Sequence, residues 1–388
     1  MKTRYIFPSV ILGTLILVSL SFLLNIRIRS GLSGVYEESE KPAVSLQSVL
    51  DGSYQSSYDQ WFSDNFNFRE YFVLLFNQWK YSVFEKSGNE TVMLGKEKML
   101  YAQNRIQIRQ NIDRKRSYRE NSVVAYAENI AAIQRGLEKQ GKAFCYLISP
   151  YKENVYPEYI PKRYSWYWDK GDALPKSLRE GLMEEFDRLG VHYYDALTEL
   201  LEEKDENSPM FFPHTGIHWN YLGVAKTVEG VFQALNENGP FTLPAFELSV
   251  TESPQPAAHD LDYYNILNLI GGKLDEVYYH VEPVYQFPEG QSKLNLLYYG
   301  TSFGTHQAEF LEMGQRAFES VCRYHYLDHK TRFTAQGSER TVINQDVQAS
   351  GILEDIALAD IVIMENLDSE LAGTHLDMAE YLAAGLAA

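Results

Sequence analysis

The sequence predicts an α/β protein with a mainly parallel sheet flanked by helices, preceded by one N-terminal transmembrane helix. Two observations lead to this. Short apolar runs alternate with helical stretches of about 10–15 residues through most of the 388-residue chain, which is the pattern of strand–helix–strand units. Residues 6–26 are predominantly apolar and uncharged, and about 20 such residues span a bilayer as a helix. An apolar content of 45% is ample for a core and excludes a wholly disordered chain.

The apolar N-terminal stretch also predicts where the body of the chain resides. Two basic residues stand on each side of it, and a long acidic region follows. No small-x-small cleavage site follows Leu24, which favours an uncleaved signal anchor over the alternative, a cleaved signal peptide. We expect a single-pass membrane anchor in residues 1–30, a polar tether in residues 31–49 and one extracytoplasmic domain, extracellular or periplasmic, in residues 50–388.

The regular elements of the body follow from periodicity and from Gly and Pro stops. An aromatic-rich helix is expected over residues 68–84. Loops are expected over residues 239–290, because that stretch includes Pro240, Pro244, Pro254, Pro256 and Pro283. The other expected helices are 122–140, 178–189, 221–235, 304–318, 352–358 and an Ala-rich C-terminal segment, and the expected strands are 143–148, 191–194, 294–299, 321–327 and 361–364.

Charge and cysteine content exclude several classes of function. The chain has 35 Lys and Arg against 52 Asp and Glu, a net charge of −17. Such a surface repels phosphate backbones, so no nucleic-acid partner is expected. With only Cys145 and Cys322, cysteine-rich zinc modules and disulfide scaffolds are excluded, although one disulfide between the two remains an open alternative. No cofactor is expected.

The first candidate site residue is Ser302, in the turn Gly300-Thr-Ser-Phe-Gly304 between a strand and a helix. A serine there stands at the carboxyl edge of the sheet, where open α/β sheets bind ligands. The helix N-terminus offers backbone N–H groups to a developing oxyanion. Ser302 is therefore either a nucleophile or simply the N-cap of the helix.

The second candidate is His218, in the stretch Pro213-His214-Thr-Gly-Ile-His218-Trp-Asn220. A serine nucleophile needs a base within hydrogen-bond reach, and histidine is the usual one. His218 could instead be a packing residue at the start of the helix. His214 and His218 could also bind a metal, but no nearby Asp, Glu or Cys completes a ligand set, so no metal is expected.

Five segments, taken in order, resemble the SGNH-hydrolase-like proteins of the AlgX/AlgJ type and the related DHHW group. The likeness covers roughly residues 50–365. The segments are Trp61-Phe-Ser-Asp-Asn-Phe-Asn-Phe-Arg69, Val92-Met-Leu-Gly-Lys96 with Leu100-Tyr101, Ile148-Ser-Pro-Tyr-Lys-Glu-Asn-Val-Tyr-Pro-Glu-Tyr-Ile-Pro161, Thr215-Gly-Ile-His-Trp-Asn220 after Tyr194-Asp195, and Tyr299-Gly-Thr-Ser-Phe303.

This resemblance implies an SGNH-like fold and a role in the O-acetylation of an exported or cell-wall polysaccharide. Ser302 would carry an acetyl ester and His218 would act as its base. The backbone N–H of Ser302 would form part of the oxyanion hole. A membrane-bound acyl-transfer protein would be the partner, because acetyl-CoA is not available outside the cytoplasm.

One departure from the family bears on activity. The family places an Asp two residues before its His, where this chain has Gly216. Asp260 and Glu365 are the expected replacements for this His-orienting carboxylate. Two alternatives to the transferase remain: a carbohydrate acetylesterase that uses the same residues with water as the acceptor, and a non-catalytic polysaccharide-binding or assembly subunit, which the glycine favours.

Overall fold

The structure is a computed structural model of the 388-residue chain. It describes residues 5–24, 26, 31–34, 39–109, 118–165, 176–205, 208–271, 276–290, 292–343, 346–371 and 373–387. The chain divides into two compact units. The first comprises Met1–Leu94 and Tyr263–Leu274, and the second comprises Gly95–Asp262 and Asp275–Ala388.

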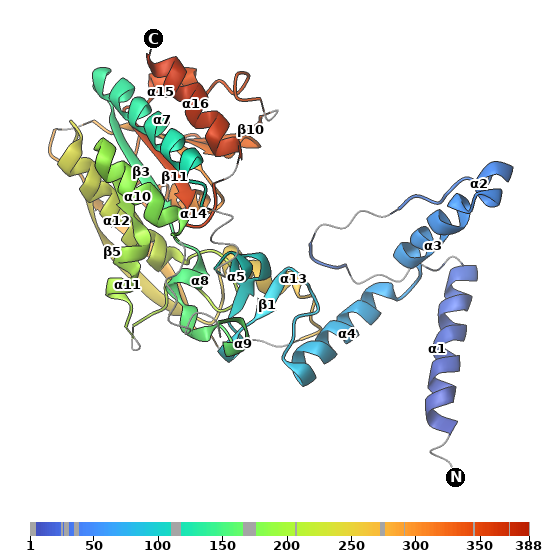
Figure 1. The fold of residues 1–388 in the computed structure, drawn as a ribbon. Helices are drawn as coiled ribbons and strands as arrows, with labels where there is room; N and C mark the ends of the chain where they lie inside the picture. The colour runs from blue at the N-terminus through green and yellow to red at the C-terminus, as the bar shows by residue number, and fades with distance from the viewer. Residues whose placement is uncertain are drawn as a thin grey trace. The chain divides into compact units, whose positions relative to one another are not determined.

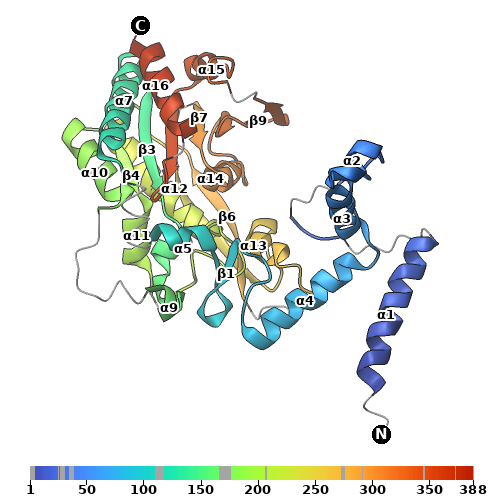
Figure 2. The ribbon, with the colours of Figure 1, turned by 45° about the vertical axis from the view of Figure 1, so that its right-hand side comes forward.

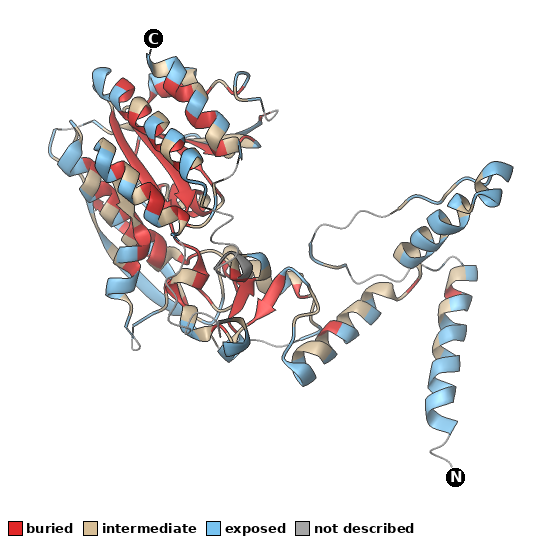
Figure 3. Ribbon diagram, in the orientation of Figure 1, coloured by how far each residue is buried: buried red, intermediate tan, exposed pale blue. Residues whose placement is uncertain are grey.

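The first unit is helical. It begins with α1 (Ile6–Leu23), which is pale blue along most of its length in Figure 3 because its side chains are exposed. Among the described residues α1 is the one helix long and apolar enough to cross a membrane, in agreement with the predicted span. The unit continues with α2 (Leu46–Leu50), α3 (Ser53–Asn65), α4 (Arg69–Phe84) and β1 (Val92–Leu94). The predicted aromatic helix is confirmed as α4. The expected boundaries at residues 30 and 49 stay predictions.

The second unit is built on a seven-stranded sheet of order β10-β9-β8-β7-β11-β3-β4. Figure 1 shows two of its central strands, β3 and β11, side by side. Five neighbouring strands run parallel, as the sequence predicts. They are β8 (Ser320–His325), β7 (Asn295–Gly300), β11 (Ile361–Leu367), β3 (Ala143–Ser149) and β4 (Tyr193–Asp195). Two antiparallel strands, β9 (His329–Thr334) and β10 (Gly337–Val342), extend one edge. The sheet is therefore mixed at one edge and parallel at its centre.

Helices cover both faces of this sheet. Alternate residues of β3, β7, β8 and β11 join one buried cluster with four helices on one face. These helices are α7 (Glu120–Lys139), α10 (Leu178–Leu189), α15 (Ile352–Leu358) and α16 (Gly373–Ala387). Figures 1 and 2 show α7 and α16 side by side, and Figure 3 shows β3 and β11 almost entirely buried. On the other face, α12 (Tyr221–Asn238) and α14 (Phe303–Leu311) pack on each other and on β3 and β7.

Short elements complete the second unit around the carboxyl edge of the sheet. They are η2 (Lys96–Lys98), β2 (Leu100–Ala102), α5 (Gln103–Arg109), α8 (Lys152–Val155), η3 (Pro157–Tyr159), α9 (Lys162–Ser165), α11 (Ala196–Glu203) and η4 (Ala258–Leu261), which leads into α13 (Asp262–Ile266).

The segment 239–290 differs from the expectation of loops. It holds a long antiparallel ribbon of β5 (Ala245–Ser253) and β6 (Tyr278–Gln286). Pro283 lies inside β6, opposite Leu248. Proline lacks an N–H but is tolerated on an edge strand, and both strands of a two-stranded ribbon are edges. The helix expected to reach residue 318 also ends earlier, at Leu311.

The two cysteines are both buried and free, so the structure does not form the disulfide left open by the sequence. Burial raises the pKa of each thiol to about 12. Neither thiol is therefore ionised at neutral pH, and both behave as small core residues.

Candidate active site

Ser302 stands where β7 ends and α14 begins. Its backbone is helical, with φ −59°, and among the described residues its side chain makes no capping hydrogen bond. The capping role falls to its neighbour, because Thr301 Oγ1 accepts a hydrogen bond from the Phe303 N–H at 3.2 Å. The hydroxyl of Ser302 is therefore not used to cap α14.

His218 comes to Ser302 from a loop that is distant in sequence. The loop leads into α12, whose first turn is capped by the Asn220 side chain. The buried Trp219 donates its Nε1–H to the Phe303 carbonyl at 3.2 Å, which fixes this loop to the start of α14. As a result His218 Nε2 lies 2.9 Å from Ser302 Oγ. The sequence named both residues as candidates, and the structure places them in hydrogen-bond contact.

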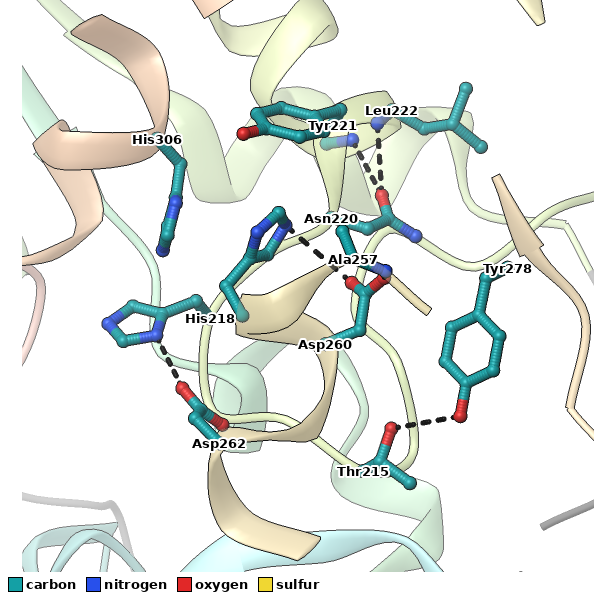
Figure 4. A network of polar contacts seen from close by, with 12 residues as sticks. Thr215, His218, Asn220, Tyr221, Leu222, Ala257, Asp260, Asp262, Tyr278 and His306 are labelled. Carbon is teal, nitrogen blue, oxygen red and sulfur yellow. Dashed lines mark hydrogen bonds and ion pairs between the residues drawn. The ribbon is translucent and has the colours of Figure 1, made fainter. Parts of the chain in front are cut away.

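The carboxylate behind the imidazole is Asp262, at the start of α13. Its Oδ2 lies 2.6 Å from His218 Nδ1 (Figure 4). Its Oδ1 accepts the Ile217 N–H at 2.8 Å. An acceptor-only carboxylate on Nδ1 places the imidazole proton there and leaves Nε2 free to accept the Ser302 proton. Ser302, His218 and Asp262 thus have the contacts and order of a serine–histidine–aspartate triad.

The expectation that Asp260 or Glu365 orients His218 is therefore corrected. Asp260 lies two residues before Asp262 but accepts the Ala257 N–H at 2.8 Å within η4. Burial raises the pKa of Asp260 to about 6. No local pattern distinguished the two aspartates, since Asp262 follows His218 by 44 residues and the segment around it was expected to be loop.

Gly216 is explained by the same segment. A Cβ built on it would lie 2.9 Å from the His259 carbonyl oxygen and 3.1 Å from that of Asp260. The segment that carries Asp262 thus packs directly against the glycine. An aspartate at position 216 and the present course of residues 259–262 are sterically incompatible without a shift of the backbone.

Glu365 acts on the nucleophile turn instead of on His218. From β11 its carboxylate accepts the Thr301 N–H at 2.6 Å and the Thr301 hydroxyl at 3.0 Å. Burial raises the pKa of Glu365. Gly300 permits this approach, because a Cβ there would fall 2.4 Å from Glu365 Oε2. Glu365 therefore fixes the turn that presents Ser302.

Arg323, a residue that sequence reasoning missed, holds the same turn from β8. Its guanidinium is buried and donates from Nη2 to the Thr301 carbonyl. The Thr301 C=O and the Ser302 N–H belong to one planar trans peptide and point in opposite directions. Arg323 thereby directs the Ser302 N–H away from itself and polarises it, as a donor to an oxyanion requires.

Two further histidines surround the candidate base. The ring centroid of His306 lies 4.8 Å from that of His218, and His259 lies 4.2 Å beyond His306. Burial lowers the pKa of His306, and lowers that of His259 to about 3. Both rings are therefore neutral near pH 7. A positive charge formed on His218 would be balanced by the direct contact with Asp262.

Lys152 supports the loop that carries His218. Its buried ammonium donates to the carbonyls of Pro213 (2.5 Å), Gly216 (2.7 Å), Leu100 (3.0 Å) and His214 (3.2 Å). Burial lowers its pKa to about 7. The sequence analysis included Lys152 in one of the segments that resemble the family but gave this residue no role. The structure shows that Lys152 binds the loop just before His218.

The alternative of a metal bound by His214 and His218 has no support in the geometry. His214 Nδ1 lies 3.2 Å from Glu276, whereas His218 uses its two ring nitrogens for Ser302 and Asp262. Over the described residues there is no group of three or more His, Cys, Asp or Glu that could hold a metal ion.

Comparison with known proteins identifies related sequences. The family model described as "SGNH hydrolase-like domain, acetyltransferase AlgX" matches residues 92–286, a range that includes His218 and Asp262 but ends before Ser302. The probable alginate O-acetylase AlgJ of Pseudomonas syringae pv. tomato is 26% identical over 228 residues, which is 57% of this chain and 52% of the relative. The chain thus matches about half the length of that relative.

Two solved structures are also similar. The O-acetyltransferase domain of Pseudomonas putida AlgJ has a TM-score of 0.45 at 15% identity, covering 76% of this chain and 99% of the other. AlgX of Pseudomonas aeruginosa has a TM-score of 0.48 at 13% identity, covering 76% of this chain and 67% of the other.

Proposed function

The chain belongs to the AlgX family of SGNH-hydrolase-like proteins, and from this premise we propose that it is a membrane-anchored, extracytoplasmic O-acetyltransferase acting on a polysaccharide. The observation that carries the proposal is the contact chain from Ser302 Oγ through His218 to Asp262. The AlgJ relative, named as a probable alginate O-acetylase, supports acetyl transfer as the reaction.

The first half-reaction forms an acetyl ester on Ser302. His218 Nε2 takes the hydroxyl proton as Ser302 Oγ attacks the acetyl carbonyl carbon of a donor. The resulting oxyanion is stabilised by the Ser302 N–H, which Arg323 orients and polarises. When the tetrahedral intermediate collapses, the bond from the acetyl carbon to the donor breaks, and His218 returns the proton to the leaving group.

The second half-reaction transfers the acetyl group to a sugar. His218 removes the proton of a sugar hydroxyl as its oxygen attacks the ester carbonyl. The bond from the acetyl carbon to Ser302 Oγ then breaks, and the serine regains its proton from His218. Asp262 stays ionised throughout and stabilises the imidazolium formed in each half.

The proposed location requires a membrane-bound donor. If α1 anchors the chain and the body lies outside the cytoplasm, acetyl-CoA is not available there. A membrane-bound acyl-transfer protein is then the partner that delivers the acetyl group. The chain would act at the membrane surface on a polysaccharide as it is exported or as part of the cell wall.

The test uses the full-length protein in detergent with p-nitrophenyl acetate. Wild type should release nitrophenol and accumulate a Ser302 peptide heavier by one acetyl group, detected by mass spectrometry. Ser302→Ala and His218→Asn should abolish both signals, whereas Ser249→Ala, which changes an exposed serine on β5, should keep them. Equal activity in wild type and Ser302→Ala would exclude Ser302 as the nucleophile.

The same experiment separates transfer from hydrolysis. With a soluble oligosaccharide present, a transferase yields acetylated sugar in place of free acetate, whereas the acetylesterase alternative yields acetate alone. A wild-type protein that forms no acetyl-Ser302 at all would favour the non-catalytic alternative. The sequence favoured that alternative because Gly216 supplies no carboxylate, whereas the contact of Asp262 with His218 supports the catalytic proposal.

A further inference from the structure

Helix α4 carries a row of apolar side chains on its exposed side. Phe72, Leu75, Phe76, Trp79 and Val83 recur at the spacing of one helical face, and we call them the α4 stripe. Their exposed fractions run from 38% for Phe72 to 61% for Val83. Single exposed apolar residues are common, but a continuous row that includes Trp and two Phe marks a contact surface.

The opposite side of α4 faces its own unit. There Asn77 is buried and donates its side-chain amide to the Leu267 carbonyl at 2.9 Å. Gln78 accepts the Ile270 N–H at 3.1 Å. The helix therefore turns polar side chains inward and its largest apolar side chains outward. This is the reverse of a helix that packs in water, so the α4 stripe is suited to an apolar surrounding.

The α4 stripe is continuous with α1 through a row of aromatic rings. Phe22, in the last turn of α1, packs edge-on against Phe62 of α3, with ring centroids 5.5 Å apart. Phe62 stacks on Phe66 at 6.1 Å, and Phe66 on Phe72 at 6.3 Å. The row thus leads from the end of the apolar helix to the first residue of the stripe.

The aromatic side chains near this row also hold cations over their rings. Lys80 Nζ lies 5.2 Å from the Phe76 ring centroid, and Lys41 Nζ lies 5.1 Å from that of Trp61. Lysines that lay their stems along apolar rings keep the ammonium at a polar level. Trp with flanking basic residues at the end of an apolar span is the composition of a membrane–water interface.

We propose that the α4 stripe lies in the lipid headgroup layer of the membrane that α1 crosses. The chain would then hold to the bilayer by two elements, one spanning it and one lying in its surface. This inference rests on the anchoring role proposed for α1 and is independent of the chemistry proposed for Ser302.

The test measures whether single labelled positions lie in lipid or in water. It uses the full-length protein reconstituted, without other proteins, into phosphatidylethanolamine–phosphatidylglycerol vesicles. An environment-sensitive fluorophore is attached at Ile11→Cys in α1, Phe76→Cys in the stripe or Glu128→Cys on the exposed side of α7. Both native cysteines are buried and do not compete for the label. Each sample is quenched by a phosphatidylcholine carrying a nitroxide near its headgroup, or by aqueous iodide. Val83→Cys serves as a second stripe position if Phe76→Cys folds poorly.

The expected result is that the labels at positions 11 and 76 are quenched by the lipid nitroxide several-fold more than the label at position 128, and are protected from iodide. No lipid quenching at position 11 would overturn the anchoring itself. Lipid quenching at 11 with iodide quenching at 76 and 83 would overturn the stripe proposal alone. Protection of 76 only in native membranes that contain other proteins would assign the stripe to a protein partner and likewise overturn the proposal.

Discussion

Replacing Asp262 by Asn is the sharpest test of the candidate triad. The Asn side chain keeps the size of Asp, and its carbonyl oxygen can still accept the Ile217 N–H, as Asp262 Oδ1 does at 2.8 Å. Its NH₂ group then faces His218 Nδ1, which lies 2.6 Å from Oδ2 in the native chain. Since an NH₂ group only donates, Nδ1 must accept, and the imidazole proton moves to Nε2. In that tautomer Nε2 cannot take the proton of Ser302.

The size of the expected loss follows from how well Asp262 is enclosed. The corresponding change in a fully adapted serine protease triad lowers kcat by about 10⁴. The side chain of Asp262 is 28% exposed, so water can partly replace it as an acceptor from Nδ1–H. We therefore expect kcat to fall by about 10³, which is about 4 kcal/mol of transition-state stabilisation at about 1.4 kcal/mol per factor of ten. KM should change little, because Asp262 acts through His218.

The assay is the hydrolysis of p-nitrophenyl acetate by the full-length protein in detergent, and the chain offers a matched control. Asp260→Asn makes the same chemical change two residues away, at a side chain that bonds the Ala257 N–H. It should leave kcat within about threefold of the wild type, since it leaves the imidazole tautomer unchanged. The reasoning is refuted if Asp262→Asn keeps near-wild-type kcat, or if the Asp260 variant is the more impaired of the two.

Three further outcomes follow from the same region. Gly216→Ala puts a Cβ 2.9 Å from the His259 carbonyl oxygen, so the melting temperature of this variant should be lower than that of the wild type. The control Gly373→Ala, whose Cβ would have nothing within 4 Å, should have the melting temperature of the wild type. Equal melting temperatures of the two variants would contradict the packing described. Arg323→Met removes the hydrogen bond to the Thr301 carbonyl and should lower kcat about tenfold at unchanged KM. This loss is smaller than the roughly 10²–10³ lost when an oxyanion donor itself is removed, because Arg323 acts only through the Thr301–Ser302 peptide. An effect confined to KM would argue against this role. Burial raises the pKa of Asp260 from 3.8 to about 6, so between those values its carboxyl stays protonated in the folded chain but ionises in the unfolded chain. The melting temperature of Asp260→Asn should therefore rise relative to the wild type from about pH 4 to about pH 6, and a constant difference would show that the carboxyl is not buried as described.

Several helices and strands around the central sheet could be predicted because the sequence patterns that define them are local. Helices α10 and α15 begin and end at the predicted residues, since a Ser cap and a Gly stop bound the first and a Gly precedes the second. Parallel strands that are buried on both faces appear in the sequence as short apolar runs, and this pattern predicted β3 and β11. The ribbon of β5 and β6 was missed because its prolines and exposed residues resemble loop, and only the pairing of two edges makes it a sheet.

Two of the three residues of the candidate triad could be named from the sequence, and the third could not. Ser302 and His218 each stand at a strand–helix or loop–helix junction that can be recognised from the sequence alone. Asp262 has no such mark, because its role depends on the path by which residues 257–262 return to the His218 loop. The small residue at position 216 was the available signal. A glycine in place of a carboxylate leaves room for another segment to supply it.

The position of Asp262 at a boundary of the chain has a practical consequence for dissecting the protein. It is the last residue of the second unit before the chain enters the first with Tyr263–Leu274. Residues 263–274 are held by side chains from the N-terminal region. The side-chain amide of Asn77 donates to the Leu267 carbonyl, and that of Asn89 donates to the Ile266 carbonyl. A fragment that begins at Gly95 would retain Ser302, His218 and Asp262. It would lose the bonds to the Ile266 and Leu267 carbonyls, which lie close after Asp262 in the sequence. Removing the N-terminal region to obtain a soluble fragment therefore removes the hydrogen-bond partners of the segment that directly follows Asp262.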